Sequence, residues 1–142
     1  MILDPEKLIV DLKSISEGLN TGTFTIPLKK INWNIEDVEP DEDEGILDLV
    51  INYEYETVQC TGKLNAVFRT ACARCLEPAR FTISEDISRE YTWDHDPSDE
   101  KEKEIISTFD ELDIFNALRE AVLLSIPGKP LCSPDCAGIS YN

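Results

Sequence analysis

The sequence has little of what an enzyme requires. Its 142 residues include one histidine and six glycines, which leaves little material for a glycine-rich phosphate loop. The histidine, His95, lies between Asp94 and Asp96 with no nucleophile nearby, and is most simply a solvated loop residue. The acids occur in runs, so no pair stands out as a general acid and a general base. We therefore expect no catalytic activity and no small-molecule substrate.

Long apolar segments and a secretory signal are missing as well. No apolar run approaches the ~18 residues that a membrane-spanning helix requires. Residues 1–6 carry acids where a secretory signal has basic residues followed by an apolar stretch. We expect a cytoplasmic protein that does not bind membranes. In that reducing compartment, the five cysteines are expected to be thiols or metal ligands and not disulfides.

Basic residues are scarce: 13 Lys and Arg stand against 29 Asp and Glu, a formal net charge of −16. Such a field repels phosphate backbones and attracts basic proteins. The acids concentrate in segments 34–45 and 94–104, which we expect to be solvated loops of a single domain spanning residues 1–142. Between these loops, residues 57–84 form a basic window with a single acid, Glu77. Its bases are Lys63, Arg69, Arg74 and Arg80.

The hydrophobic pattern predicts an α+β fold built on an antiparallel β-sheet or a partly open barrel. Apolar and polar residues alternate in segments 47–55, 63–69 and 81–93, which predicts three strands with one wet face each. Buried parallel strands would instead be apolar throughout. Shorter strands are expected near residues 8–12 and 23–27, and a turn is expected at residues 18–22.

Helical periodicity follows the strands. Apolar residues recur at helical spacing from Ile114 to Ser125, Asp113 precedes them as a candidate N-cap, and Pro127-Gly128 ends the segment. The pattern predicts one amphipathic C-terminal helix over residues 113–125, packed on the apolar face of the sheet.

Two closely spaced cysteine pairs are candidate metal ligands. Cys72 and Cys75 lie where a hairpin must turn between two predicted strands, and Cys132 and Cys136 lie in a tail after the helix. With two or three intervening residues, both thiolates of a pair can bind one ion, with Zn–S bonds of about 2.3 Å. If the fold brings the tail beside the hairpin, the four thiolates form one structural zinc site that is closed to substrate.

Two other interpretations of these cysteines remain open. They can be ordinary reduced thiols, as we expect for Cys60, a small core residue. A redox pair at Cys72 and Cys75 would belong at a helix start in a βαβ setting, and the sequence shows no such setting.

The segment Cys72-Ala-Arg-Cys75-Leu-Glu-Pro78 resembles the C-x-R-C-L-x-P motif of the YceD family, the large ribosomal RNA subunit accumulation proteins. The Asp-led helix, the Leu-Ser-Ile-Pro element at residues 124–127 and the Pro-Leu-Cys to Cys-Ala-Gly tail at residues 130–138 are also similar to that family. Many relatives carry further cysteines after this tail, where this chain has Ile139-Ser140-Tyr141-Asn142. A metal site must therefore use Cys132 and Cys136.

The resemblance implies a role in the synthesis, processing or stability of large-subunit ribosomal RNA. We expect a non-catalytic ribosome-biogenesis factor that binds the assembling large subunit, through a basic ribosomal protein or through ribosomal RNA. In the RNA mode, the four bases of the window would contact phosphates, weakly and in a salt-sensitive way. Alternatively, they lie on the wet faces of strands and keep the sheet soluble. The competing function is an acidic protein–protein adaptor with a structural zinc site, unrelated to ribosomes.

Overall fold

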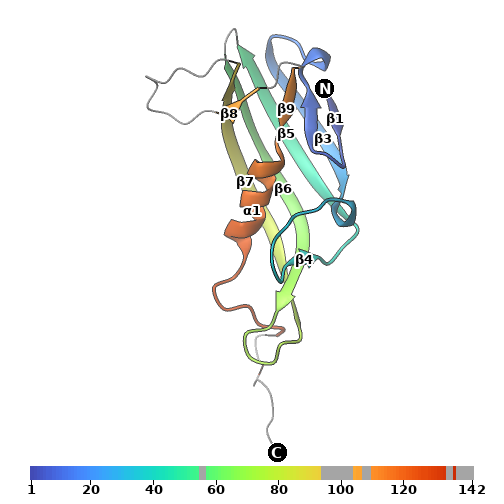
Figure 1. Cartoon of the computed structure of the whole chain (residues 1–142), viewed down its shortest axis with the longest axis vertical. Coiled ribbons are helices and arrows are strands. Elements are labelled where there is room, and N and C mark those ends of the chain that lie inside the picture. Colours follow the sequence, from blue (N-terminus) through green and yellow to red (C-terminus); the bar gives the residue numbers. More distant parts are fainter. Residues whose placement is uncertain (55–56, 94–103, 107–109, 134–135, 137–142) are drawn as a thin grey trace, which may run out of the picture.

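The computed structural model describes residues 1–54, 57–93, 104–106, 110–133 and 136 (Figure 1). His95 and almost all of the predicted acidic loop at 94–104 lie outside these residues. The described chain forms a large and a small β-sheet, with one α-helix, α1 (Phe115–Ser125), against the large sheet. Within the described residues, no helix combines the length and the hydropathy that a membrane span requires.

The large sheet has the strand order β3-β5-β6-β7-β8, and β4 pairs with β6. Its strands are β3 (Gly18–Pro27), β4 (Glu39–Pro40), β5 (Glu44–Glu54), β6 (Thr57–Ala71), β7 (Pro78–Thr92) and β8 (Glu104–Ile105). Neighbouring strands are antiparallel except β7 and β8, and the described sheet does not close into a barrel. The predicted α+β class, with an antiparallel sheet and a C-terminal helix, is therefore confirmed.

The strict alternation of the sequence explains the three longest strands. On β7, Phe81, Ile83 and Ile87 are buried on the inner face, while Thr82 and Ser84 are exposed on the outer face. Such a strand buries one face against a core and leaves the other in water, as the sequence predicts.

The expected turn at residues 18–22 is wrong, because β3 begins at Gly18 and pairs with β5 along its whole length. Gly18 has φ +96°, a conformation that glycine adopts without steric cost, but the next residues are extended. The glycines and small polar residues of this segment resemble a turn. Pairing with a ten-residue stretch of β5 overrides that local preference.

The small sheet has the order β1-β2-β9 and is antiparallel throughout. Its strands are β1 (Ile2–Asp4), β2 (Ile9–Asp11) and β9 (Glu111–Asp113). Short 3-10 helices follow β2 and β3 at η1 (Leu12–Ser14) and η2 (Leu28–Lys30). The strand expected near residues 8–12 is β2, because apolar residues flank it and lengthen the alternating pattern, whereas the sequence did not predict the equally short β1 and β9.

The start of the helix differs from its prediction because Asp113 belongs to β9. The helix begins at Phe115, and Ile114 occupies the N-cap position without a side-chain cap. Asp113 still serves the helix start, because its Oδ1 accepts a hydrogen bond of 2.9 Å from the backbone N–H of Phe115.

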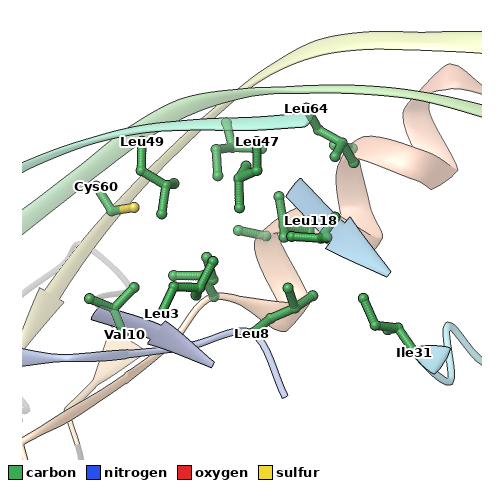
Figure 2. Close-up of a cluster of buried hydrophobic side chains, with 14 of the residues drawn as sticks. Leu3, Leu8, Val10, Ile31, Leu47, Leu49, Cys60, Leu64 and Leu118 are labelled. Atoms are coloured by element: carbon green, nitrogen blue, oxygen red, sulfur yellow. The ribbon is translucent and has the colours of Figure 1, made fainter. Parts of the chain in front are cut away.

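One apolar core lies between the inner face of the large sheet, the small sheet and α1 (Figure 2). The large sheet contributes residues such as Leu47 and Leu64, the small sheet contributes Val10, and the helix contributes Leu118. Cys60 is buried in the same core, as the sequence predicts, and burial raises the pKa of its thiol to about 12. The outer face of the large sheet carries the polar residues discussed below.

Candidate metal centre and its charged surroundings

The connection between β6 and β7, residues 72–77, is a tight turn held by its own backbone. The N–H of Cys72 donates to the carbonyl of Glu77 at 2.7 Å, and the N–H of Leu76 donates to the carbonyl of Cys72 at 3.0 Å. Leu76 has φ +65°, a left-handed backbone conformation that residues other than glycine rarely adopt. The turn is therefore a fixed scaffold for the two cysteines within it.

The tail lies against this turn, as Figure 1 shows at the lower end of the hairpin. The N–H of Ala73 donates to the carbonyl of Pro130 at 2.7 Å, and Arg74 Nη1 donates to the carbonyl of Cys136 at 2.6 Å. These two contacts position the second cysteine pair beside the first.

The four sulfur atoms lie within 4.8 Å of one another. Cys72 Sγ is 3.6 Å from Cys136 Sγ, and Cys75 Sγ is 3.5 Å from Cys132 Sγ. These separations exceed the ~2.05 Å of a disulfide bond. A zinc ion with four Zn–S bonds of about 2.3 Å at tetrahedral angles needs sulfurs about 3.8 Å apart. The arrangement therefore suits one metal ion bound by all four cysteines, and thiolate ligands select soft ions.

The electrostatics of the cluster also suit a cation. Burial of the Cys72 sulfur opposes its ionisation, but the backbone N–H groups of Arg74, Cys75 and Cys132 donate to it and lower the pKa of Cys72 to about 6. Hydrogen bonds with the sulfurs of Cys136 and Cys75 raise the pKa of Cys132 to about 12. Four sulfurs at this spacing do not all ionise without a positive charge between them, and a metal ion supplies that charge.

A redox role fits this geometry less well. The lowered pKa of Cys72 is a property of reactive thiols, but its side chain is buried, whereas a redox cysteine must be reached by its substrate. The pair also lies in a turn between two strands and not at the start of a helix.

The first predicted acidic loop, residues 34–45, is not a free loop throughout, because β4 lies in it and β5 begins at Glu44 (Figure 1). Pro40 lies opposite Phe68 of β6, and Ile46 lies opposite Asn65, so the five residues between them face only two on β6. Asp41 still donates its N–H to the carbonyl of Val67 at 2.9 Å. We call residues 41–43, between β4 and β5, the acidic bulge.

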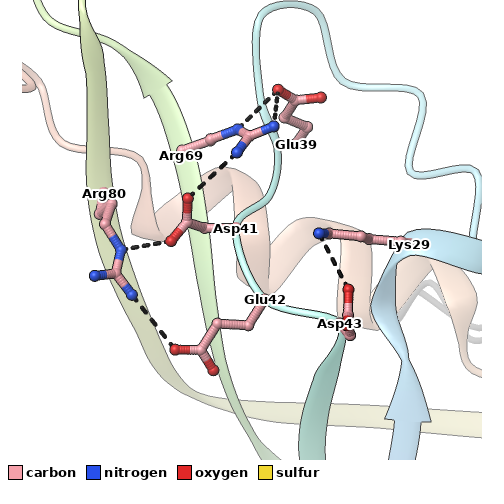
Figure 3. Close-up of polar contacts among 7 residues, drawn as sticks. All are labelled: Lys29, Glu39, Asp41, Glu42, Asp43, Arg69 and Arg80. Carbon is pink, nitrogen blue, oxygen red and sulfur yellow. Dashed lines mark hydrogen bonds and ion pairs between the residues drawn. The ribbon is translucent and has the colours of Figure 1, made fainter.

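The acidic bulge and its neighbour Glu39 pair with bases of the sheet and of η2 (Figure 3). Asp41, whose side chain is 16% exposed, bridges two arginines: its Oδ1 is 3.5 Å from Arg69 Nη1, and its Oδ2 is 2.5 Å from Arg80 Nε. A Glu39 carboxylate oxygen is 2.8 Å from Arg69 Nη2. The hydrogen bond and the Coulombic attraction to Glu39 raise the pKa of Arg69 above its usual value, and Asp41 adds a smaller contribution. The bridge joins β6 and β7 to the acidic segment.

The four bases of the predicted window are thus in different surroundings. Arg69 and Arg80 are paired with acids, and Arg74 donates to a main-chain carbonyl. Lys63 is exposed on the outer face, where Asp48 and Asp86 are its register partners on the flanking strands. The window is therefore surrounded by acids that the fold brings in from other segments. A role of these bases as phosphate contacts stays a prediction.

A groove that the sequence did not indicate adjoins the cysteine turn. It has a volume of about 510 Å³, and its lining includes Ile35, Val38, Leu76 and Pro78. A second cavity of about 700 Å³ continues along the same segment past Trp33. The one available sequence signal is a large apolar residue, Leu76, in a turn where glycine or a polar residue is usual.

Helix α1 holds the segment that walls this groove. Arg119 Nε donates to the carbonyl of Trp33 at 3.0 Å, and its Nη2 donates to the carbonyl of Asn34 at 3.0 Å. Trp33 also packs edge-on against Phe68 of β6, with ring centroids 5.4 Å apart. The segment is therefore fixed to both the helix and the sheet.

Comparison with known proteins adds the following findings. The family model named YceD, described as "Large ribosomal RNA subunit accumulation protein YceD", matches residues 60–142. Proteins from Mycobacterium bovis and from two strains of Mycobacterium tuberculosis, named only as uncharacterized, are 33% identical over 96 residues. That alignment covers 66% of this chain and 46% of each relative, so the chain spans about half the length of the curated relatives it matches. No solved structure matches.

Proposed function

The chain belongs to the YceD family of large ribosomal RNA subunit accumulation proteins, and from that membership we propose that it is a non-catalytic factor that binds the assembling large subunit. The match over residues 60–142 carries the proposal, because it includes the cysteine turn, the helix and the tail. We propose that the protein acts in the cytoplasm and that it supports the accumulation of large-subunit ribosomal RNA.

We propose further that the direct partner is a basic ribosomal protein. The net charge of −16 attracts basic proteins and speeds their association. The bases that could have met RNA are partly engaged already, since Arg69 and Arg80 pair with Glu39 and the acidic bulge. A surface of this kind favours a cationic partner over a phosphate backbone.

The proposed cofactor is a structural zinc ion held by Cys72, Cys75, Cys132 and Cys136. The fit is supported by the sulfur separations of 3.5 and 3.6 Å. When bound, zinc would cross-link the hairpin turn to the tail and leave no open coordination position for a substrate. Two hydrogen bonds of the chain, from the Ala73 N–H to the Pro130 carbonyl and from the Arg74 side chain to the Cys136 carbonyl, already hold the two segments in place for it.

The test measures binding of the purified, zinc-loaded chain to three immobilised probes. These are precursor particles of the large subunit, the protein fraction extracted from large subunits, and naked large-subunit ribosomal RNA. We expect binding to the particles and to the protein fraction, weakening as salt is added, and no comparable binding to naked RNA.

Two results would contradict the proposal. Equal binding to naked RNA would favour the bases as phosphate contacts. Lys63→Gln would then be the informative variant, because replacing Arg69 or Arg80 also disrupts the ion pairs of Asp41. Failure to bind any of the three probes would favour an acidic adaptor unrelated to ribosomes.

A further inference from the structure

The groove beside the cysteine turn combines apolar walls with an acidic rim. Ile35 and Val38 lie on one side, and Leu76 and Pro78 at the end of the hairpin lie on the other. The groove shares Ile35 and Val38 with the larger cavity that runs along the same segment, so the two form one continuous depression. Two adjoining cavities of about 510 and 700 Å³ leave room for several side chains of one peptide segment.

Leu76 is the feature of this groove that folding alone does not explain. Its side chain is 70% exposed, although it lines an apolar wall. Its φ of +65° would be adopted more easily by glycine, so the turn keeps a leucine against a steric penalty. An exposed apolar residue on a strained backbone is typical of a contact site, because the strain is not compensated by burial within the chain.

The charged residues around the groove indicate which charge its occupant carries. Three acids line the two cavities: Glu36, Asp37 and Glu39. The two bases that also line them are engaged, since Lys29 pairs with Asp43, and Arg69 pairs with Glu39 and Asp41. The uncompensated charge is therefore negative and lies beside apolar walls.

We propose that this groove docks a segment of a basic ribosomal protein, with an apolar side chain against Leu76 and lysine or arginine side chains against Glu36 and Asp37. The inference rests on the proposed function and adds the site and the chemistry of the segment that it recognises. Burial of one leucine-sized side chain at such a site corresponds to about tenfold in affinity or more.

The decisive variants change Leu76 without disturbing the turn. Leu76→Gly removes the side chain and suits the left-handed backbone, and Leu76→Asn is a second variant because asparagine also tolerates that conformation. The matched control is Leu19→Ala, since Leu19 is 72% exposed and lies on β3. It pairs with Asn52 of β5, at the end of the sheet that is distant from the cysteine turn. Thermal unfolding should show all three variants folded.

The probes are two labelled lysine-rich peptides, one with a central leucine and one with alanine in its place, and the protein fraction of large subunits. Wild type should bind the leucine peptide about tenfold more tightly than the alanine peptide. Both Leu76 variants should lose that preference and bind the protein fraction about tenfold more weakly, whereas Leu19→Ala should match wild type.

The outcomes separate this inference from the proposed function. Equal binding of the protein fraction by wild type and the folded Leu76 variants would show that the groove is not the docking site, and it would leave the proposed function unaffected. Failure of wild type to bind the fraction would overturn the ribosomal partner. The absence of a leucine preference in wild type would overturn the groove whatever the fraction does. Binding of a labelled single-stranded RNA that is lost in Leu76→Gly would make the groove a nucleic-acid site and also overturn the inference.

Discussion

The sulfur of Cys72 lies 3.6 Å from the sulfur of Cys136, although 64 positions separate the two residues in the chain. The hairpin turn and the tail meet at this point, where the Ala73 N–H donates to the Pro130 carbonyl and the Arg74 side chain donates to the Cys136 carbonyl. A metal ion bound here would join the two ends of the family-matched region. Its contribution can be measured with one substitution in each pair.

We expect the purified chain to hold about one zinc ion, and Cys72→Ser or Cys136→Ser to lose it. A ligand present a thousandfold above its Kd stabilises the folded state by about 4 kcal/mol, so these variants should unfold at a clearly lower temperature. Elemental analysis after dialysis and a thermal melt measure both effects. The control is Cys60→Ala, which changes a buried cysteine of the main core and should keep its metal. A folded wild-type chain with no metal would contradict the prediction.

The thiols should differ in reactivity with the metal. At about pH 8, iodoacetamide should label few cysteines in the zinc-loaded chain and more after removal of the ion, because only a free thiolate reacts quickly. Cys72 should react before Cys132, since hydrogen bonds lower the pKa of Cys72 to about 6 and raise that of Cys132 to about 12. Cys60 should react only after unfolding, since burial raises the pKa of its thiol to about 12 and keeps it protonated at that pH. Mass spectrometry counts the labels. Full labelling of the zinc-loaded, folded chain would show that the cysteine cluster does not protect its thiols.

The parts of the fold that the sequence predicted are those governed by local periodicity. Leu47, Leu49 and Ile51 alternate with residues of the wet face, and this alternation is sufficient to define β5 because a half-buried strand requires it. The cysteine turn was also predictable, since Cys72 and Cys75 separate two such runs. The sequence left their approach to the tail as a condition for a four-thiolate site, and the structure brings the four sulfurs within 4.8 Å of one another.

The parts that could not be predicted depend on contacts between distant segments. The bridge from Asp41 to Arg69 and Arg80 exists because the acidic bulge lies beside β6, between β4 and the start of β5, and nothing in the local sequence specifies that register. The groove at Leu76 depends on the same segment lying beside the hairpin. From the sequence we therefore expected the acids of residues 34–45 to form a solvated loop, and we did not predict that they pair with Arg69 and Arg80.

Arg119 offers a test of how the groove wall is held. Arg119→Ala removes the donors to the carbonyls of Trp33 and Asn34, so the segment from 33 to 38 should exchange its amide hydrogens faster than in wild type. The free energy of unfolding should fall by about 1–2 kcal/mol, as for other lost hydrogen bonds from charged groups. Hydrogen exchange followed by mass spectrometry resolves the segment. The control is Arg89→Ala. Arg89 of β7 pairs with Glu120 of α1, so its loss should leave the amide exchange of residues 33–38 unchanged.

Asp41 and Asp43 form a matched pair for testing the acidic bulge. Both are aspartates of the same bulge whose carboxylates pair with bases. The Asp41 side chain is 16% exposed and bridges two arginines, whereas the Asp43 side chain is 85% exposed and pairs with Lys29.

Asp41→Asn should lower the free energy of unfolding by about 1–2 kcal/mol, because it leaves Arg69 and Arg80 facing each other across β6 and β7 without a shared carboxylate. Asp43→Asn should change it by less than about 0.5 kcal/mol, as for other exposed pairs. Urea unfolding measures both, and repeating it in roughly 1 M salt should remove the effect of Asp43→Asn while most of the effect of Asp41→Asn remains, since a partly buried pair is screened less. Equal effects of the two substitutions would mean that the bridge adds nothing beyond surface charge, and that the acidic bulge is held by its β4 pairing alone.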